Sequence, residues 1–329
     1  MQKIKRDVLI EKAGELLRNG TVDRVLGWKK GEFAYDLTPA LFTSEKEMEE
    51  EFVYGDFCGA NFSKYLVKET LQEGRVLVFL KPCDTYSFNQ LLTEHRFDRE
   101  KVYAVGIPCE GMLDANRIRL LAGDFLSADC GEDTVTVHTL FDGDKTLSGS
   151  DVLAERCRNC KSKKHVAYDE LLGDEGEVLD SHRFDEVEKL EAMTPDERFA
   201  FWQNELSRCI RCNACRDVCP ACTCEKCVFD NPASGVENKA AADSFEEKLF
   251  HIIRAFHVAG RCTDCGECSR VCPQHIPLHL LNRKFIKDID TLYGEYQAGA
   301  EVGSRAPLVN FTKDDPEPGE ALKGGNGNA

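Results

Sequence analysis

Residues 209–227 of the chain read CIRCNACRDVCPACTCEKC. Seven of these nineteen residues are cysteines, and the first four follow the spacing Cys-x2-Cys-x2-Cys-x3-Cys-Pro. The same spacing returns at residues 262–273, which read CTDCGECSRVCP. Three evenly spaced thiolates can bind one face of a four-iron, four-sulfur (4Fe–4S) cube, while the cysteine before proline reaches a neighbouring cube. The two motifs therefore predict a pair of 4Fe–4S clusters.

The fourth cysteine of each motif is expected to cross to the other cluster. One cluster is accordingly assigned to Cys209, Cys212, Cys215 and Cys272. The second cluster is assigned to Cys262, Cys265, Cys268 and Cys219. Zinc is the alternative, but zinc sites seldom use three evenly spaced cysteines followed by Cys-Pro. Residues 206–299 are thus expected to form a mainly helical, two-cluster ferredoxin-like domain.

Composition narrows the class of protein. The chain has 329 residues, 17 cysteines and a formal net charge of −16. An odd number of regularly spaced cysteines favours metal ligation in a reducing, cytoplasmic setting over disulfides. The negative net charge argues against a nucleic-acid partner, because nucleic acids are themselves negatively charged. The longest apolar run is only Val76 to Leu80, and the first residues lack an apolar core, so neither membrane insertion nor a secretory signal is expected.

Three helices are expected around the cysteine motifs. The first begins at Thr194 with Pro195 in its first turn. The second runs between the motifs from a capping box at Ser244 and Glu247 to Gly260, and the third begins at Pro277. Apolar residues at helical spacing should face the core: Phe199, Trp202 and Leu206; Phe245, Leu249, Ile252, Ile253 and Phe256; Leu278, Leu281, Phe285, Ile289, Leu292 and Tyr296. Residues 166–205 are expected to form a helical linker, and residues 300–329 a disordered tail.

In the amino-terminal half, two apolar stretches are each followed by a similar short motif that contains Pro-Cys. GRVLVFL leads into Lys-Pro-Cys83-Asp84, and KVYAVGI leads into Pro-Cys109-Glu. The stretch TYSFNQLLTEHRF between them predicts a helix capped by Asp84, so the segment reads as a strand, a helix and a parallel strand. Both cysteines would then lie at the edge of the sheet where ligands bind. The alternative is that they are small buried residues.

The cysteines left over can be connected in two ways. A strand at 134–140 precedes a short helix that delivers Cys157 and Cys160. In the first arrangement, Cys83, Cys109, Cys157 and Cys160 hold a third 4Fe–4S cluster, and Cys222, Cys224 and Cys227 serve a further metal site or remain thiols. In the second, Cys157 and Cys160 combine with two of those three. The first is favoured because strand ends bring Cys83 and Cys109 together. Cys58 and Cys130 are interpreted as structural.

Residues 50–165 resemble a known family. FCGANFSKYL, EGRVLVFLKPCDTYSF, KVYAVGIPCEGM and AERCRNC follow one another as in the beta subunit family of hydrogenases and dehydrogenases that reduce the deazaflavin coenzyme F-420. The resemblance implies an α/β domain over residues 1–165, with a parallel or mixed sheet, iron–sulfur clusters and often FAD. The stretch after Cys160 departs from the family's flavin and coenzyme pocket, and the chain has no GxGxxG turn.

These patterns predict an iron–sulfur electron-transfer subunit of an oxidoreductase complex. The resemblance implies a complex of the hydrogenase, formate dehydrogenase or heterodisulfide reductase type. The subunit's partners would be flavin- or metal-containing redox subunits of a hetero-oligomer in anaerobic metabolism. The alternative function is a flavin-containing subunit that itself reduces a soluble two-electron carrier, either deazaflavin or nicotinamide. A redox-sensing regulator is a third possibility, but it would need an effector domain that the sequence does not show.

Overall fold

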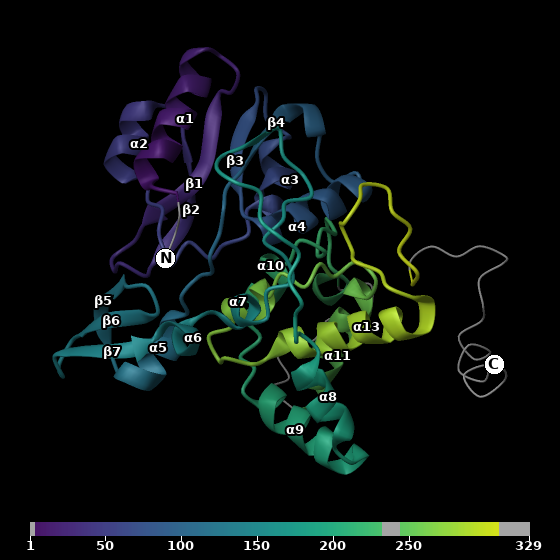
Figure 1. The fold of residues 1–329 in the computed structure, drawn as a ribbon. Coiled ribbons are helices and arrows are strands. Elements are labelled where there is room, and N and C mark those ends of the chain that lie inside the picture. Colours follow the sequence, from purple (N-terminus) through teal and green to yellow (C-terminus); the bar gives the residue numbers. More distant parts are fainter. Residues whose placement is uncertain (1–3, 232–243, 309–329) are drawn as a thin grey trace.

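The computed structural model describes residues 4–231 and 244–308, with side chains from 248 onward in the second range. An α/β part occupies the amino-terminal half of the chain, and a group of helices joined by cysteine-bearing loops follows it (Figure 1). No helix in the described part of the chain combines the length and the apolar character needed to cross a bilayer.

A five-stranded mixed sheet forms the centre of the amino-terminal half. Its strands lie in the order β2-β1-β3-β4-β8, where only the β1–β2 pair is antiparallel. They are β1 (Arg24–Lys30), β2 (Leu37–Phe42), β3 (Val76–Leu80), β4 (Val102–Gly106) and β8 (Glu170–Leu171). All five residues of β3 are buried, as expected for a central parallel strand. The main core joins this sheet to α1 (Arg6–Arg18) and α4 (Pro82–Thr93).

The predicted strand–helix–strand unit is present as β3, α4 and β4. The two strands pair in parallel, with Val76 opposite Val102 and Leu80 opposite Gly106. The helix starts earlier than the sequence suggested, however. Lys81 is its N-cap residue and Pro82 its first residue, so Asp84 lies inside the first turn rather than at the cap. Proline favours this first helical position because the missing N–H would be unbonded there anyway.

Residues 166–205, which were expected to form a helical linker, begin with a short strand instead of a helix. This strand returns to the sheet as β8, which pairs with the end of β4. The expected helices follow as α8 (Asp185–Ala192) and α9 (Pro195–Ser207). The amino-terminal half also contains the short helices α2 (Glu45–Glu51), which packs beside α1 (Figure 1), and α3 (Leu66–Glu69), with 3-10 turns at 63–65 and 99–101.

A small antiparallel sheet stands apart from the main one (Figure 1). Its strands are β5 (Phe125–Cys130), β6 (Thr134–Thr139) and β7 (Asp144–Ser148), in that order. The strand predicted at 134–140 is therefore β6. This sheet packs with α5 (Ala115–Ala122) and α6 (Gly149–Val152), and the chain then enters α7 (Glu155–Arg158), which carries Cys157.

The carboxy-terminal helices surround the two cysteine motifs. They are α10 (Ala214–Asp217), α11 (Ser244–Val258), α12 (Glu267–Arg270) and α13 (Leu278–Tyr293), with a 3-10 turn at 228–230. The cap predicted at Thr194 is present on α9, because Thr194 and Glu197 form a reciprocal capping box. The predicted burial is wrong for four residues that the structure shows exposed: Phe199 (58%), Ile252 (44%), Phe256 (61%) and Leu292 (38%). The predicted box at Ser244 and Glu247 involves side chains outside the described ones, as does Phe245.

Part of the expected disordered tail is ordered. Residues 300–308 fold back beside α4, where the backbone N–H of Gly303 donates to the Thr93 hydroxyl over 2.9 Å and Ala306 is buried. Residues 309–329 lie outside the described part of the chain.

Candidate metal centres

The two cysteine motifs share one backbone conformation. The residue before the second cysteine has a left-handed φ in both, 55° at Arg211 and 58° at Asp264. The residue after that cysteine does so too, with 63° at Asn213 and 68° at Gly266. A short helix, α10 or α12, then begins and carries the third cysteine. Left-handed residues within such a loop can turn successive backbone N–H groups toward one side, which makes a concavity suited to an anionic group.

The four cysteines assigned to the first cluster lie around a single cavity. Cys209, Cys212, Cys215 and Cys272 all line it, together with Phe250 and His251 of α11. Burial raises the pKa of Cys215 to about 12, and the thiolates of Cys268, Cys209 and Cys272 add to that rise. Cys272, from the second motif, therefore lies with the first motif, as the crossed assignment requires.

Cys219 lies with the second motif in the same way. Burial raises the pKa of Cys265 well above its ordinary value, and the charges of Glu267, Cys219 and Cys262 raise it further. Burial also raises the pKa of Cys268, and Cys219 again contributes to the rise. The arrangement fits a cluster ligated by Cys262, Cys265, Cys268 and Cys219.

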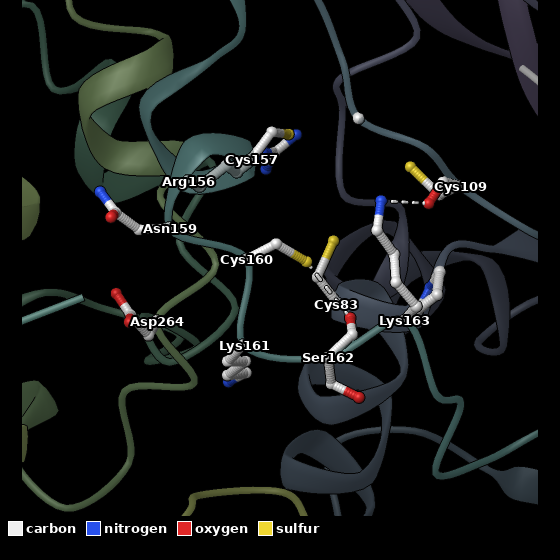
Figure 2. A pocket seen from close by; sticks show the side chains of 12 residues that line it. Cys83, Cys109, Arg156, Cys157, Asn159, Cys160, Lys161, Ser162, Lys163 and Asp264 are labelled. Carbon is white, nitrogen blue, oxygen red and sulfur yellow. Dashed lines mark hydrogen bonds between the residues drawn. The ribbon is translucent and has the colours of Figure 1, made fainter. Parts of the chain in front are cut away.

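A third set of cysteines meets at the edge of the main sheet. Cys83 is in the first turn of α4, Cys109 follows β4, Cys157 is on α7 and Cys160 comes directly after it. All four line one pocket, and their side chains surround its interior (Figure 2). The early start of α4 places Cys83 on a helix rather than on the loop expected from sequence. Lys163 ties the Cys109 segment to the pocket by donating to the Cys109 carbonyl over 2.6 Å.

A single zinc ion and an iron–sulfur cube require different distances between the ligand sulfurs. Tetrahedral zinc with Zn–S bonds of about 2.3 Å would hold its sulfurs about 3.8 Å apart. Within the described residues, the only potential ligand atoms found in groups of three within 4.8 Å belong to Glu155, Glu186 and His279. Sulfurs that bind different irons of a cube stand farther apart than those around one zinc ion.

The three spare cysteines line a further cavity, and one of them, Cys222, also forms a side-chain hydrogen bond with Cys219 of the second set. This cavity, lined by Cys222, Cys224 and Cys227, contains neither Cys157 nor Cys160. The second arrangement combined Cys157 and Cys160 with two of the three spare cysteines. The structure instead places these two sets of cysteines in different cavities. The cavity of the spare cysteines is also lined by cationic side chains, including Lys64 and Arg216. Cys58 is fully buried in the main core, consistent with a packing role.

Buried charges connect the third site to the second motif. Arg156, next to Cys157, donates to the Cys265 carbonyl over 2.8 Å and to the Glu267 carboxylate over 2.6 Å. Lys161, next to Cys160, donates to the Thr263 carbonyl over 2.6 Å. Burial opposes ionisation of Glu267, but the guanidinium groups of Arg270 and Arg156 lower its pKa to about 2. The sheet-edge pocket and the second motif thus share one interface.

Several polar residues at the sites were missed by sequence reasoning. His251 places Nε2 3.2 Å from the Cys209 sulfur, and Asn282 directs its amide nitrogen at the Cys268 sulfur over 3.7 Å. Burial, Arg254 and Arg211 lower the pKa of His251 to about 3, so the ring is neutral. The available signal was that His251, Arg254 and Asn282 interrupt otherwise apolar helical stretches.

The chain is similar to known iron–sulfur proteins. Residues 205–276 match the family described as a 4Fe-4S dicluster domain. The chain is also similar to the F420-dependent formate dehydrogenase subunit beta of Methanocaldococcus jannaschii, with 25% identity over 91% of this chain and 92% of that protein. The F420-dependent formate dehydrogenase 1 subunit beta of Methanococcus maripaludis is 25% identical over 65% of this chain and 71% of its own length.

These matches confirm the resemblance read from the sequence. They support an iron–sulfur electron-transfer subunit of an oxidoreductase complex and do not favour the alternative of a flavin subunit that reduces a carrier itself. A solved F420-reducing [NiFe] hydrogenase complex from Methanosarcina barkeri aligns with a TM-score of 0.36 and 13% identity, over 49% of this chain and 59% of that chain. A likeness this low carries no argument.

Proposed function

We propose that this chain is a three-cluster relay subunit, in which three cysteine sites lie in a row. The first site is the sheet-edge pocket of Cys83, Cys109, Cys157 and Cys160. The middle site is the set of Cys262, Cys265, Cys268 and Cys219, and the last is the set of Cys209, Cys212, Cys215 and Cys272. Bound 4Fe–4S clusters would supply one-electron transfer at each site.

The order of the sites is the observation that carries the proposal. Arg156 and Lys161, which flank the cysteines of the first site, reach the carbonyls of Cys265 and Thr263 in the second motif. The charge of Cys268 in the middle site raises the pKa of Cys215 in the last site. The two cysteines are therefore close neighbours. The middle site therefore touches both others, which is the arrangement that a relay needs.

The protein supports such a relay by burial. Cys215, Cys268 and Cys272 are each less than a tenth exposed, whereas Cys212 is exposed. Burial of Cys268 keeps water from the middle site, and exposure at Cys212 gives the last site, whose ligands Cys215 and Cys272 are buried, a route to a partner. We place the docking surface for one redox partner around Cys212 and the neighbouring exposed Ile210. FAD is not part of the proposal, because clusters account for the cavities of these three sites.

The similarity to formate dehydrogenase beta subunits suggests the kind of partner. We propose a catalytic oxidoreductase subunit that delivers electrons to one end of the row, and a second redox subunit or soluble acceptor at the other end. The assembly, rather than this chain alone, would complete the reaction.

The test is anaerobic purification of the tagged full-length chain with its native partners. Substrate of the co-purifying catalytic subunit is then added while the clusters are followed by electron paramagnetic resonance (EPR). The relay predicts that cluster signals appear on addition of substrate and vanish when an acceptor is supplied. A chain that purifies alone and completes a two-substrate reaction unaided would contradict the proposal.

A further inference from the structure

Arg254 lies close to cysteines of both carboxy-terminal sites and lines the cavity of Cys222, Cys224 and Cys227. It lies on α11 and is 4% exposed. Its guanidinium donates to the carbonyl of Cys215, a residue of the last site, over 2.8 Å. Burial lowers the pKa of Arg254, but the thiolates of Cys219, Cys215 and Cys268 outweigh burial and raise it. Cys219 and Cys268 belong to the middle site, so one side chain faces the ligands of both.

Several arginines near the sites pair with carboxylates, whereas Arg254, like Lys161, has none among the described residues. Arg156 and Arg270 share Glu267. Arg283 binds Asp264 and Glu155, Arg261 binds Glu94, and Arg216 binds Asp230. Within the described residues, Arg254 forms no ion pair with an acidic side chain, and its buried Nε has no hydrogen-bond partner.

A buried, unpaired guanidinium is costly unless an anionic group compensates it. The anions near Arg254 are the thiolates of Cys219, Cys215 and Cys268 in the two sites and that of the neighbouring Cys222. A 4Fe–4S cluster with four thiolates is itself anionic and becomes more so on reduction, and the low dielectric of the interior strengthens its attraction to a nearby cation. The positive charge of Arg254 therefore favours the reduced state at both sites and weakens the repulsion between two reduced sites.

We propose that Arg254 sets the reduction potentials of the middle and last clusters together, as a cation shared between them. The inference rests on the proposed function, since it needs both clusters in place. It adds a potential-setting residue that contributes no ligand and that the cysteine pattern does not reveal.

The test compares the Arg254→Met and Arg254→Lys variants of the full-length, anaerobically purified protein in EPR-monitored redox titrations. Lys248→Met is the matched control, because Lys248 is a cation on the same helix that faces the Phe199 ring instead. Arg254→Met should lower the reduction equilibrium constants of both clusters at least tenfold, which is about 59 mV for one electron. Arg254→Lys should shift them less, and Lys248→Met not at all.

Unchanged potentials in an Arg254→Met protein that keeps its iron would overturn the inference. If Arg254→Met alone loses iron, Arg254→Gln is titrated in its place with the same expected shift. Loss of iron from every variant, including the charge-preserving Arg254→Lys, would also overturn it, because Arg254 would then be needed for assembly and not through its charge. Absence of two cluster signals in the unsubstituted protein would instead refute the proposed function, so the two failures can be told apart.

Discussion

At the scale of single residues, cysteine spacing carries most of the information about the sites. Left-handed backbone at Arg211, Asn213, Asp264 and Gly266 bends both motifs alike, so equal spacing in sequence becomes equal geometry in space. The proline after the fourth cysteine directs Cys219 and Cys272 away from their own motifs. Local sequence rules are sufficient here because each motif is a short, continuous loop.

Replacing Cys219 by Ser should therefore damage the distant cluster and spare the near one. The cluster of Cys262, Cys265 and Cys268 would lose its fourth thiolate, while that of Cys209, Cys212, Cys215 and Cys272 would keep all of its ligands. EPR of the chemically reduced variant should show that one of the two signals from the carboxy-terminal clusters is much weaker.

Cys130→Ser is the control, since Cys130 lies in the small sheet outside all three sites. Separate Cys209→Ser and Cys262→Ser variants show which signal belongs to which cluster, because their assignment does not depend on crossing. If Cys219→Ser removed the signal that Cys209→Ser removes, and not the one that Cys262→Ser removes, the crossed assignment would be wrong.

Other contacts at this scale could not be predicted from the sequence. His251, Arg254 and Asn282 reach the cysteines from α11 and α13, and their positions depend on how those helices pack. A polar residue within an apolar helical stripe signals that something polar lies opposite, but it does not say what. Phe199 shows the reverse error, because it has the right helical spacing but is still 58% exposed, with the Lys248 side chain of α11 over its ring.

At the scale of elements, the start of α4 is the feature that builds the sheet-edge site. Lys81 and Asp84, both almost fully buried, form an ion pair with 2.7 Å between Nζ and Oδ2. Lys81 also donates to the Ala60 carbonyl over 2.9 Å and lies 5.0 Å from the centre of the Trp28 ring. These contacts fix the turn that holds Cys83. The parallel strands were predictable, but this turn depends on contacts that are distant in sequence.

Replacing Asp84 by Asn should destabilise the protein by about 3–5 kcal/mol, because the Lys81 ammonium would remain buried without its counter-charge. The expected result is a lower midpoint of thermal unfolding, measured anaerobically on the iron-loaded protein.

The double variant Lys81→Met, Asp84→Leu removes both charges and should recover part of the loss. An Asp84→Asn protein as stable as the unsubstituted one would show that the ion pair does not hold this turn. Other elements were harder to foresee: β8 has only two residues, and its pairing with β4 brings together segments more than sixty positions apart.

At the scale of the whole molecule, the main sheet and the two motifs meet at one interface. Arg156 and Lys161 cross it from the first site, and Lys64 crosses it nearby by donating to the Cys222 carbonyl over 2.8 Å. The sequence predicted both parts but not their contact, because the interface is made of side chains scattered along the chain.

The net charge of −16 should influence how the chain meets its partners. Exposed charge guides association at low ionic strength and is screened when salt is added. We expect the association rate of the separated subunits to fall about tenfold between low and high salt, with a smaller change in the dissociation rate. Stopped-flow measurements at several salt concentrations check this, and an association rate that is independent of salt would contradict it.

Iron content, measured anaerobically per chain, tests the three-cluster account most directly. The unsubstituted protein should hold about 12 irons, four for each of three clusters. The double variant Cys83→Ala, Cys109→Ala should hold about 8, because the sheet-edge site loses two ligands while both carboxy-terminal sites keep theirs. Cys58→Ala, a buried cysteine outside the sites, should leave the count unchanged. About 8 irons in the unsubstituted protein, or about 12 in the double variant, would contradict the account.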